Sequence, residues 1–166
     1  MTLKFYYIDN EYIDALHEIE PKVYPSNKAG RPYIGIILKI HDVHYFAPMS
    51  SPKEKHAKLK KPVVYKINNL SDSNDKLGVI QINNMIPVPL SKLTEVKFSD
   101  ITNADYKNLL QKQYIVLKVK KKEIEKTGEE LYLKAKAGHP ISRVCNDFRK
   151  LEEYYSSLFP QQEIQK

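Results

Sequence analysis

The segment "RPYIGIILKIHDVHYFAP", residues 31–48, decides how this chain folds. Residues 33–40 form an apolar run rich in isoleucine, which is typical of a strand buried inside a sheet. His41 and Asp42 can form a tight turn, after which residues 43–48 return as a second strand. The segment therefore predicts a buried β-hairpin.

The pattern on either side of this hairpin predicts a sheet with helices packed on it. Further strands are expected at residues 3–8, 62–67, 76–82, 84–89 and 93–98. Asp9 or Asn10 can cap a short helix before the hairpin. Strands that precede helices along the chain favour the α+β class, here a twisted antiparallel sheet in a single domain of residues 1–166. The tail at 160–166 is expected to fray.

Long helices dominate the second half of the chain. Apolar residues recur at helical spacing from Asn103 to about Lys126, with lysines on the opposite side. Gly128 is expected to break this helix, and another helix is expected over residues 129–137. Ser142 can then cap the last helix.

The composition is that of a small basic protein, and its single cysteine is typical of proteins from a reducing compartment. The 166 residues include 27 Lys and Arg against 20 Asp and Glu, a formal net charge of +7, so polyanions are favoured partners. The 12 tyrosines can pack in a core, stack on a base or hydrogen-bond a phosphate. One cysteine leaves no disulfide within the chain, and no long apolar run or leader-like segment is present. We therefore expect a cytoplasmic protein without membrane contact.

The loop after the hairpin carries the residues with the most chemistry. Ser50 and Ser51 precede Pro52, and residues 53–61 then contain five lysines and one glutamate. Such a run is commonly a solvated surface loop. Here it follows directly on a strand, and hydroxyl and ammonium groups on a loop held by a sheet can cradle a phosphate.

The same groups are sufficient to cleave RNA without a metal ion, although they do not require that function. RNA carries its own nucleophile, the 2′-hydroxyl. The protein then has to accept a proton, stabilise the charged phosphorane and protonate the leaving oxygen. The sequence lacks the patterns of zinc sites, phosphate-binding glycine loops and serine hydrolases. We therefore expect neither a metal nor a cofactor.

Several blocks of the sequence resemble the toxins of type III toxin–antitoxin systems, the ToxN/AbiQ family. The most specific block is "YFAPMSSPKEKH", with "RPYIGIILKI" before it and "LGVIQINNMIPV" after it. In the helical half, "DYKNLLQKQ" and "CNDFRKLEEYY" are also similar to the family. The blocks follow the family order over residues 3–159.

The resemblance implies a compact antiparallel sheet similar to that of the MazF/Kid toxins, and a sequence-specific endoribonuclease activity. Members of the family cut cellular or phage RNA without a metal, leave a 2′,3′-cyclic phosphate and a 5′-hydroxyl, and act in phage defence by abortive infection. Their antitoxin is an RNA of short pseudoknot repeats, which the toxin processes and then binds in a closed protein–RNA assembly. The resemblance thus implies RNA as both substrate and inhibitor.

The family motif implies catalytic residues in and beside the loop. Ser51 matches its key serine, Ser50 stands where some relatives have threonine, and Lys53 matches the lysine after the Ser-Pro pair. Arg31 stands where relatives have a basic residue that lines the cleft. Tyr12 matches a tyrosine of the first helix and is a candidate for RNA binding. The proton acceptor is left open between Lys53 and a tyrosine.

Further candidates for RNA binding surround these positions. Relatives can have a tyrosine in the loop where Asn27 aligns here, and Tyr24 takes that role only if the alignment shifts. His56 ends the motif and either orders the loop or carries a proton. The remaining candidates are basic: Lys28, Lys55, Lys58, Lys60, Lys61, Lys118, Lys120 and Lys121. A non-catalytic RNA-binding module is the main alternative, whereas a DNA-binding regulator is disfavoured because no helix-turn-helix pattern is recognisable.

Overall fold

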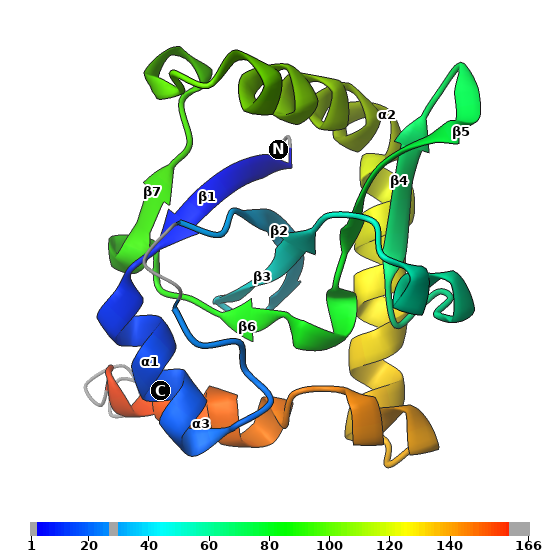
Figure 1. The fold of residues 1–166 in the computed structure, drawn as a ribbon. Helices are drawn as coiled ribbons and strands as arrows, with labels where there is room; N and C mark the ends of the chain where they lie inside the picture. Colours follow the sequence, from blue (N-terminus) through cyan, green and yellow to red (C-terminus); the bar gives the residue numbers. More distant parts are fainter. Residues whose placement is uncertain (1–2, 27–29, 160–166) are drawn as a thin grey trace.

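The computed structural model describes residues 3–26 and 30–159, without the side chain of His56; the tail at 160–166 lies outside this part. Within it, seven strands form one antiparallel sheet in the order β4–β5–β3–β2–β1–β7, with β6 paired to β3 (Figure 1). The strands are β1 (Lys4–Ile8), β2 (Tyr33–Ile40), β3 (Val43–Ser50), β4 (Tyr65–Asn69), β5 (Asp72–Ile80), β6 (Ile86–Pro87) and β7 (Leu93–Glu95). The α-helices are α1 (Asn10–Ile19), α2 (Ala104–Lys136) and α3 (Phe148–Ser157). The predicted α+β class with an antiparallel sheet is confirmed.

The predicted hairpin forms the middle of the sheet. β2 has the predicted bounds, and β3 continues beyond its predicted end. Ile40 pairs with Val43 across a two-residue turn, in which His41 adopts a φ of 53°. At the other end of the hairpin Tyr33 pairs with Pro48. The residues that precede β2 therefore lie beside the residues that follow Pro48.

The expected break at Gly128 does not occur, and α2 continues through it to Lys136. Gly128 faces the sheet, where an added Cβ would lie 2.5 Å from Cγ2 of Ile37. The glycine therefore allows the helix to approach β2 closely and does not end the helix. The chain leaves α2 at Gly138 instead, whose φ of 81° suits a residue without a side chain.

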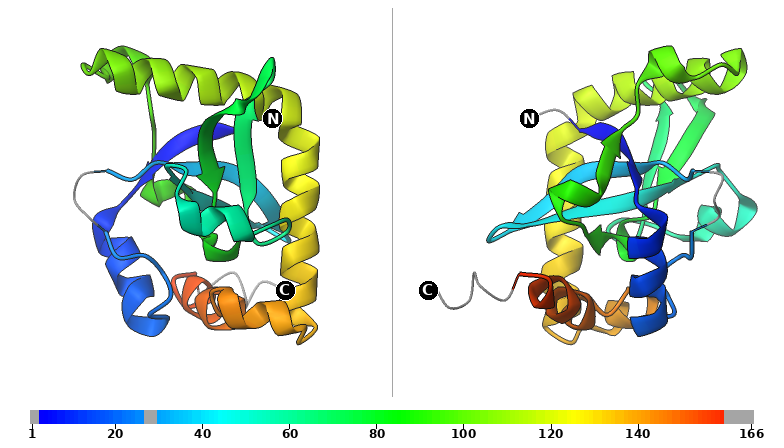
Figure 2. Two further views of the ribbon diagram at one scale, coloured as in Figure 1. Left: turned by 45° about the vertical axis from the view of Figure 1, so that its right-hand side comes forward. Right: turned by 90° about the vertical axis from the view of Figure 1, so that its left-hand side faces the viewer.

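α2 bends sharply, so that its two parts run along different edges of the molecule. Figure 1 shows its first part across the top of the view and its second part down the right-hand side, next to β4 and β5. The views in Figure 2 show the same bend from two other directions. The bend creates an inner corner between α2 and β4.

The remaining boundaries differ modestly from those predicted. Asp147, and not Ser142, caps the last helix, because its side chain accepts a hydrogen bond from N of Lys150 (3.2 Å). Ser142 lies in a 3₁₀ turn, Pro140–Val144. β4 begins later and β5 begins earlier than the sequence predicted.

Both faces of the sheet are covered, and β3 runs through the centre of the core. Tyr45 and Ala47 belong to the cluster that contains the inner face of α2, whereas Phe46 belongs to the cluster that contains residues of α1 and α3. All three side chains are fully buried. Because alternate residues of a strand point to opposite faces, β3 is held from both sides until it leaves the core.

Two observations bear on the expectations from composition. Cys145 is fully buried, and burial raises the pKa of its thiol to about 11, so it behaves as a small apolar core residue. No helix within the described residues is both long and apolar enough to cross a membrane.

Candidate active site at the end of the central strand

The candidate site begins where β3 leaves the sheet. Ser50 is the last residue of β3 and pairs with Val79 of β5, so a neighbouring strand fixes its backbone. Ser50 Oγ donates a hydrogen bond to the backbone O of Ser51 (2.9 Å). Ser51 and Lys53 follow in exposed positions before the 3₁₀ helix Glu54–Lys58. The sheet thus presents hydroxyl and ammonium groups to solvent from a defined position.

Arg31 reaches the same place from the chain before β2. The backbone N of Met49 donates a hydrogen bond to O of Pro32 (3.1 Å), which brings Arg31 to the end of β3 that carries the serines. The guanidinium lies over the ring of Tyr24, 4.7 Å from the ring centroid, and it also hydrogen-bonds Tyr33. Arg31 is therefore a positioned cation next to the hydroxyl loop.

Tyr33 supports Arg31 and is poorly suited to accept a proton. Burial raises the pKa of Tyr33 to about 12, although the positive charge of Arg31 acts in the opposite direction. The phenol is therefore protonated at neutral pH. We assign it a positioning role.

Gln81 ties the loop before β2 to the end of β5. Its side-chain Oε1 accepts hydrogen bonds from the hydroxyl of Tyr24 and from Nδ2 of Asn84 (3.2 Å for the latter). Its backbone N donates to O of Pro48 (3.0 Å). Tyr24 therefore belongs to the same site as Arg31. Gln81 was missed by the sequence reasoning, although one polar residue between apolar neighbours in "VIQI" could have drawn attention to it.

A groove of about 610 Å³ opens beside Lys53, and we call it the loop groove. It is lined by Pro52, Lys53, Glu54, Ala57, Lys66, Asn68, Lys76, Gly78 and Val79. Lys66 Nζ lies 3.4 Å from the backbone O of Ala57, so β4 contacts the 3₁₀ helix across this groove. Three lysines and one glutamate give the groove a net positive charge, as binding of a phosphate chain requires.

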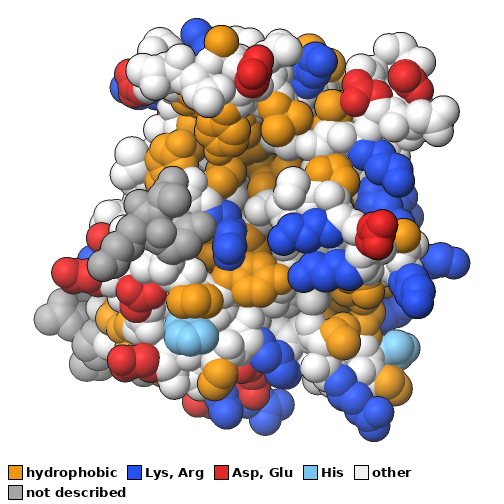
Figure 3. Space-filling view, viewed as in Figure 1, with side chains coloured by type: hydrophobic (Ala, Val, Ile, Leu, Met, Phe, Trp, Pro, Cys, Tyr) orange, Lys and Arg blue, Asp and Glu red, His pale blue; other side chains and the backbone are white. Residues whose placement is uncertain are grey.

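The face that carries the site combines apolar and basic surface. Figure 3 shows a hollow with apolar and tyrosine side chains in the middle of this face, and lysine and arginine side chains gathered to its right. A base can stack or pack on apolar surface while its phosphate contacts the cations.

The structure corrects the prediction for Tyr12. Its side chain is only 4% exposed, and its hydroxyl donates a hydrogen bond to O of Pro87 (2.5 Å). Burial raises its pKa well above the ordinary value of a tyrosine. Tyr12 therefore joins α1 to β6 in the core and does not reach a surface where RNA could contact it.

The predicted basic residues fall into separate groups. Lys55 and Lys58 are exposed on the 3₁₀ helix near the loop groove. Lys28 and the side chain of His56 lie outside the described part of the chain. The other five lie toward α2. Lys60, Lys61 and Lys120 line a second groove, whereas Lys118 lies over the ring of Tyr114 and Lys121 pairs with Glu125.

The described residues contain no group of three or more histidine, cysteine or acidic side chains placed to hold a metal ion. The site is built from hydroxyls and cations together with Tyr24 and Gln81. Such a set can bind a phosphodiester, stabilise negative charge on it and exchange protons with it.

Comparison with known proteins identifies the family. Residues 4–156 match the model of the family described as Toxin ToxN, type III toxin–antitoxin system. This chain belongs to that family. The ToxN family match covers the sheet, the loop after β3, α1, α2 and all but the last residue of α3.

Two curated relatives align over most of their length. The chain is 38% identical to Endoribonuclease ToxN of Bacillus thuringiensis subsp. kurstaki, over 90% of this chain and 81% of the relative. It is 35% identical to Endoribonuclease AbiQ of Lactococcus lactis subsp. lactis, over 92% of this chain and 87% of the relative.

Solved structures agree in fold. AbiQ, a lactococcal anti-phage endoribonuclease of a type III system, superposes with a TM-score of 0.86 at 29% identity and covers 97% of this chain and 99% of its own. A type III toxin studied for its selective inhibition by a non-coding RNA pseudoknot superposes with a TM-score of 0.84 at 33% identity, over 95% and 98% of the two chains.

Proposed function

We propose that this protein is the endoribonuclease toxin of a type III toxin–antitoxin system. Membership of the ToxN family supports this, as do relatives named endoribonucleases. The observation that carries the proposal is that the chain before β2, which carries Arg31, is hydrogen-bonded to the end of β3, where Ser50 is followed by Ser51 and Lys53. A basic site without a carboxylate pair is suited to a substrate that brings its own nucleophile.

Cleavage proceeds by attack of the 2′-hydroxyl on the adjacent phosphorus. The O2′–P bond forms and the P–O5′ bond breaks, so one proton leaves O2′ and one proton reaches the departing O5′. Lys53 and the hydroxyl of Ser51 stabilise the charge on the phosphoryl oxygens, and Arg31 holds the scissile phosphate. Ser50 shapes the loop through its bond to the carbonyl of Ser51.

Two groups at the site can exchange the protons. They are the amine of Lys53 and the phenol of Tyr24, whose hydroxyl donates to Gln81. When the hydroxyl of Tyr24 turns from Gln81 to the departing O5′, Tyr24 acts as the proton donor, and the neutral amine of Lys53 takes the proton from O2′. The products are a 2′,3′-cyclic phosphate and a 5′-hydroxyl, formed without a metal ion.

The partner we propose is an antitoxin RNA. Pseudoknot repeats, processed by the toxin and retained in a closed protein–RNA assembly, would block the same site that cuts cellular or phage RNA in the cytoplasm. The net charge of +7 favours such a partner. Structures of relatives concern inhibition or regulation by a non-coding RNA, which supports the same assignment.

The test is an RNA cleavage assay with purified protein and excess EDTA. We expect site-selective cuts whose upstream fragments end in a 2′,3′-cyclic phosphate. Intact RNA that remains tightly bound would replace the proposal with a non-catalytic RNA-binding module. Fragments that end in a 3′-hydroxyl, or cleavage that EDTA abolishes, would contradict the metal-independent mechanism.

A further inference from the structure

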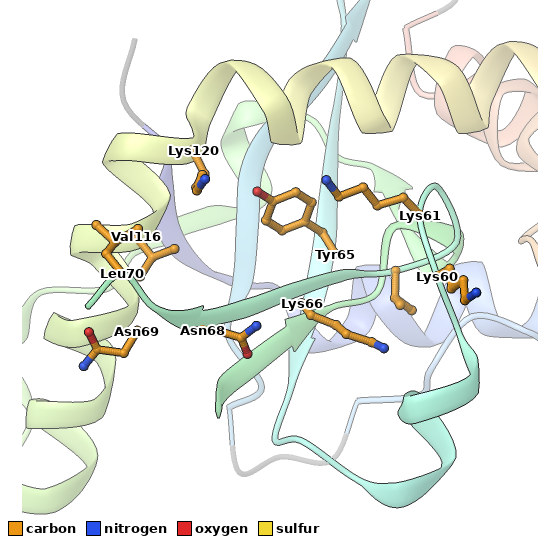
Figure 4. Close-up of a pocket in the computed structure, with 10 residues that line it drawn as sticks. Lys60, Lys61, Tyr65, Lys66, Asn68, Asn69, Leu70, Val116 and Lys120 are labelled. Atoms are coloured by element: carbon orange, nitrogen blue, oxygen red, sulfur yellow. The ribbon is translucent and has the colours of Figure 1, made fainter. Parts of the chain in front are cut away.

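A second groove lies in the inner corner between β4 and the bend of α2, and we call it the bend groove. Its volume is about 470 Å³. It is lined by Lys60, Lys61, Val64, Tyr65, Lys66, Asn68, Asn69, Leu70, Val116 and Lys120. Figure 4 shows lysine side chains on both sides of it, from the segment before β4, from β4 itself and from α2. Lysines of residues 60–66 and Lys120 of the basic run at 118–122, which are far apart in the sequence, therefore meet in one concave surface.

The bend groove shares two of its lining residues with the loop groove. Lys66 and Asn68 line both of them. These residues are two positions apart on β4, so their side chains leave the same face of the strand. A basic track therefore runs from Lys53, across β4, to Lys120 on α2.

The track has apolar surface where a base could rest. This surface is Leu70, which is 49% exposed and lies at the end of the bend groove near the β4–β5 turn, where the buried Val116 also lines the groove. A single-stranded nucleic acid presents unstacked bases next to its phosphates, and this combination needs both apolar and cationic contacts. A compact anion such as free phosphate needs only the cations.

An internal carboxylate competes for two of the cations. Glu123 forms an ion pair with Lys61 and lies 3.8 Å from Lys120. The hydrogen bond from Lys61 lowers the pKa of Glu123, and a hydrogen bond donated by the hydroxyl of Tyr65 acts in the same direction. The side chains of Lys61 and Glu123 are 54% and 41% exposed, so the pair is accessible to solvent and to a competing anion.

We propose that the bend groove is a second RNA-binding site, which holds a single-stranded part of the RNA beyond the cleaved bond. In this site Glu123 occupies Lys61 and Lys120 until an RNA phosphate displaces it. The proposal deepens the proposed function, on which it rests, because it assigns a separate surface to the same partner. It also divides the basic run at 118–122, since Lys120 lines the groove and Lys118 and Lys121 are not among its lining residues.

The experiment measures binding without cleavage. The probe is a fluorescent single-stranded RNA of mixed sequence, about 20 nucleotides long, with 2′-O-methyl groups that remove the nucleophile. Its affinity is measured by anisotropy across a salt series. Each lost phosphate contact lowers the slope of log affinity against log salt by about 0.7 for a single strand. We therefore expect the double variant Lys60→Gln/Lys120→Gln to lower the magnitude of the slope by about 1.4.

The matched control is Lys118→Gln/Lys121→Gln, which removes the same charge from the outside of the groove. We expect its slope to stay at the wild-type value. Glu123→Gln should tighten binding, because it removes the competing carboxylate. An unchanged slope in the groove variant, an equal loss in the control, or weaker binding by folded Glu123→Gln protein would each overturn the proposal.

These results are independent of the proposed catalytic activity. The probe cannot be cut, so failure to cleave natural RNA would refute the proposed function and leave the binding data intact. Conversely, a protein that cleaves RNA with the expected ends, but whose groove variant binds the probe with the wild-type slope, would refute only the second site. Inorganic phosphate serves as a competitor. Displacement of the probe at equal concentrations of phosphate and RNA phosphate would show a simple anion site and overturn the assignment to RNA.

Discussion

The two ends of β3 differ in nearly every property that matters here. At Tyr45 the strand is fully buried, and the phenol donates a hydrogen bond to Oε2 of Glu152 (2.7 Å). At the other end Ser50 is half-buried and Ser51, just beyond the strand, is exposed, and the hydroxyl of Ser50 donates a hydrogen bond to the carbonyl of Ser51. One strand therefore anchors the core at one end and presents reactive groups at the other. The difference implies that stability and cleavage can be altered separately.

The buried end is organised by one carboxylate. Glu152 on α3 accepts hydrogen bonds from Tyr45, from Tyr132 (2.5 Å) and from Nζ of Lys136 (2.7 Å). These donors come from β3 and α2, so Glu152 joins α3 to the sheet and to α2. Burial alone would raise the pKa of Glu152, but the three hydrogen bonds outweigh it and the pKa is lowered.

Lys53→Ala should give the largest difference between the effect on cleavage and the effect on stability. We expect the cleavage rate to fall by about 10³-fold or more, because both charge stabilisation and proton transfer are lost. The midpoint of urea unfolding should stay unchanged, because the side chain is exposed beyond the end of β3. Single-turnover cleavage and urea titration measure the two effects. A folded Lys53→Ala protein with full activity would remove Lys53 from the site.

Ser51→Ala and Ser50→Ala form a matched pair within the exposed end. For Ser51→Ala we expect a loss of about 10²–10³-fold in cleavage rate, as for removal of one well-placed donor to a developing oxyanion. Ser50→Ala should lose less, because its hydroxyl bonds the carbonyl of Ser51. Equal losses in the two variants would contradict this division of roles.

Glu152→Gln tests the buried end. We expect it to lower the free energy of unfolding at pH 7 by about 2 kcal/mol, because hydrogen bonds to a charged group are lost. Cleavage per folded molecule should not change. Denaturant titrations, with activity normalised to the folded fraction, measure both.

The same variant gives a pH dependence of defined sign. The pKa of Glu152 is lower in the folded protein than its ordinary value of 4.5, so its stabilisation is fully present above that value and is lost as the pH falls through the folded-state pKa. The stability difference between wild type and Glu152→Gln should therefore be constant from pH 7 to 5 and shrink below pH 4.5. A difference that grows in acid would show that the carboxylate is not stabilised by its three donors.

Gly128→Ala should have the smallest effect. The added Cβ would lie 2.5 Å from Ile37, which costs about 1–3 kcal/mol, whereas alanine is about 1 kcal/mol better than glycine in a helix. We expect a net loss of about 1 kcal/mol in the free energy of unfolding and no change in cleavage. Ile37→Val in the same background should not recover the loss, because valine keeps the Cγ2 methyl group that the new Cβ meets; urea titration measures each variant.

The sequence predicted the parts of this molecule that depend on local pattern. The hairpin follows from an apolar run, a turn and a second apolar run, and the loop that carries Ser51 and Lys53 follows from its place after a strand. Features that depend on distant contacts were not predictable. Gly128 looked like a helix breaker because its contact with Ile37 is invisible in the sequence, and Tyr12 matched a family position although its hydroxyl is buried against Pro87.

The bend groove also depends on distant contacts and was not predictable from the sequence. Charge alone could not divide the run at 118–122, because the division depends on the bend of α2 and on which lysines face β4. Gln81 was likewise inconspicuous, since its role depends on Tyr24, which comes from another loop.

The most direct test of the central claim uses the RNA and not the protein. In the proposed mechanism, the exposed end of β3 activates a nucleophile that RNA itself supplies. Once the cut site is mapped, the 2′-hydroxyl at that nucleotide is replaced by hydrogen, and both RNAs are cleaved by the wild-type protein with EDTA under single-turnover conditions. We expect complete loss of cleavage at the deoxy position, with binding retained. Cleavage of the deoxy substrate at a comparable rate would contradict it.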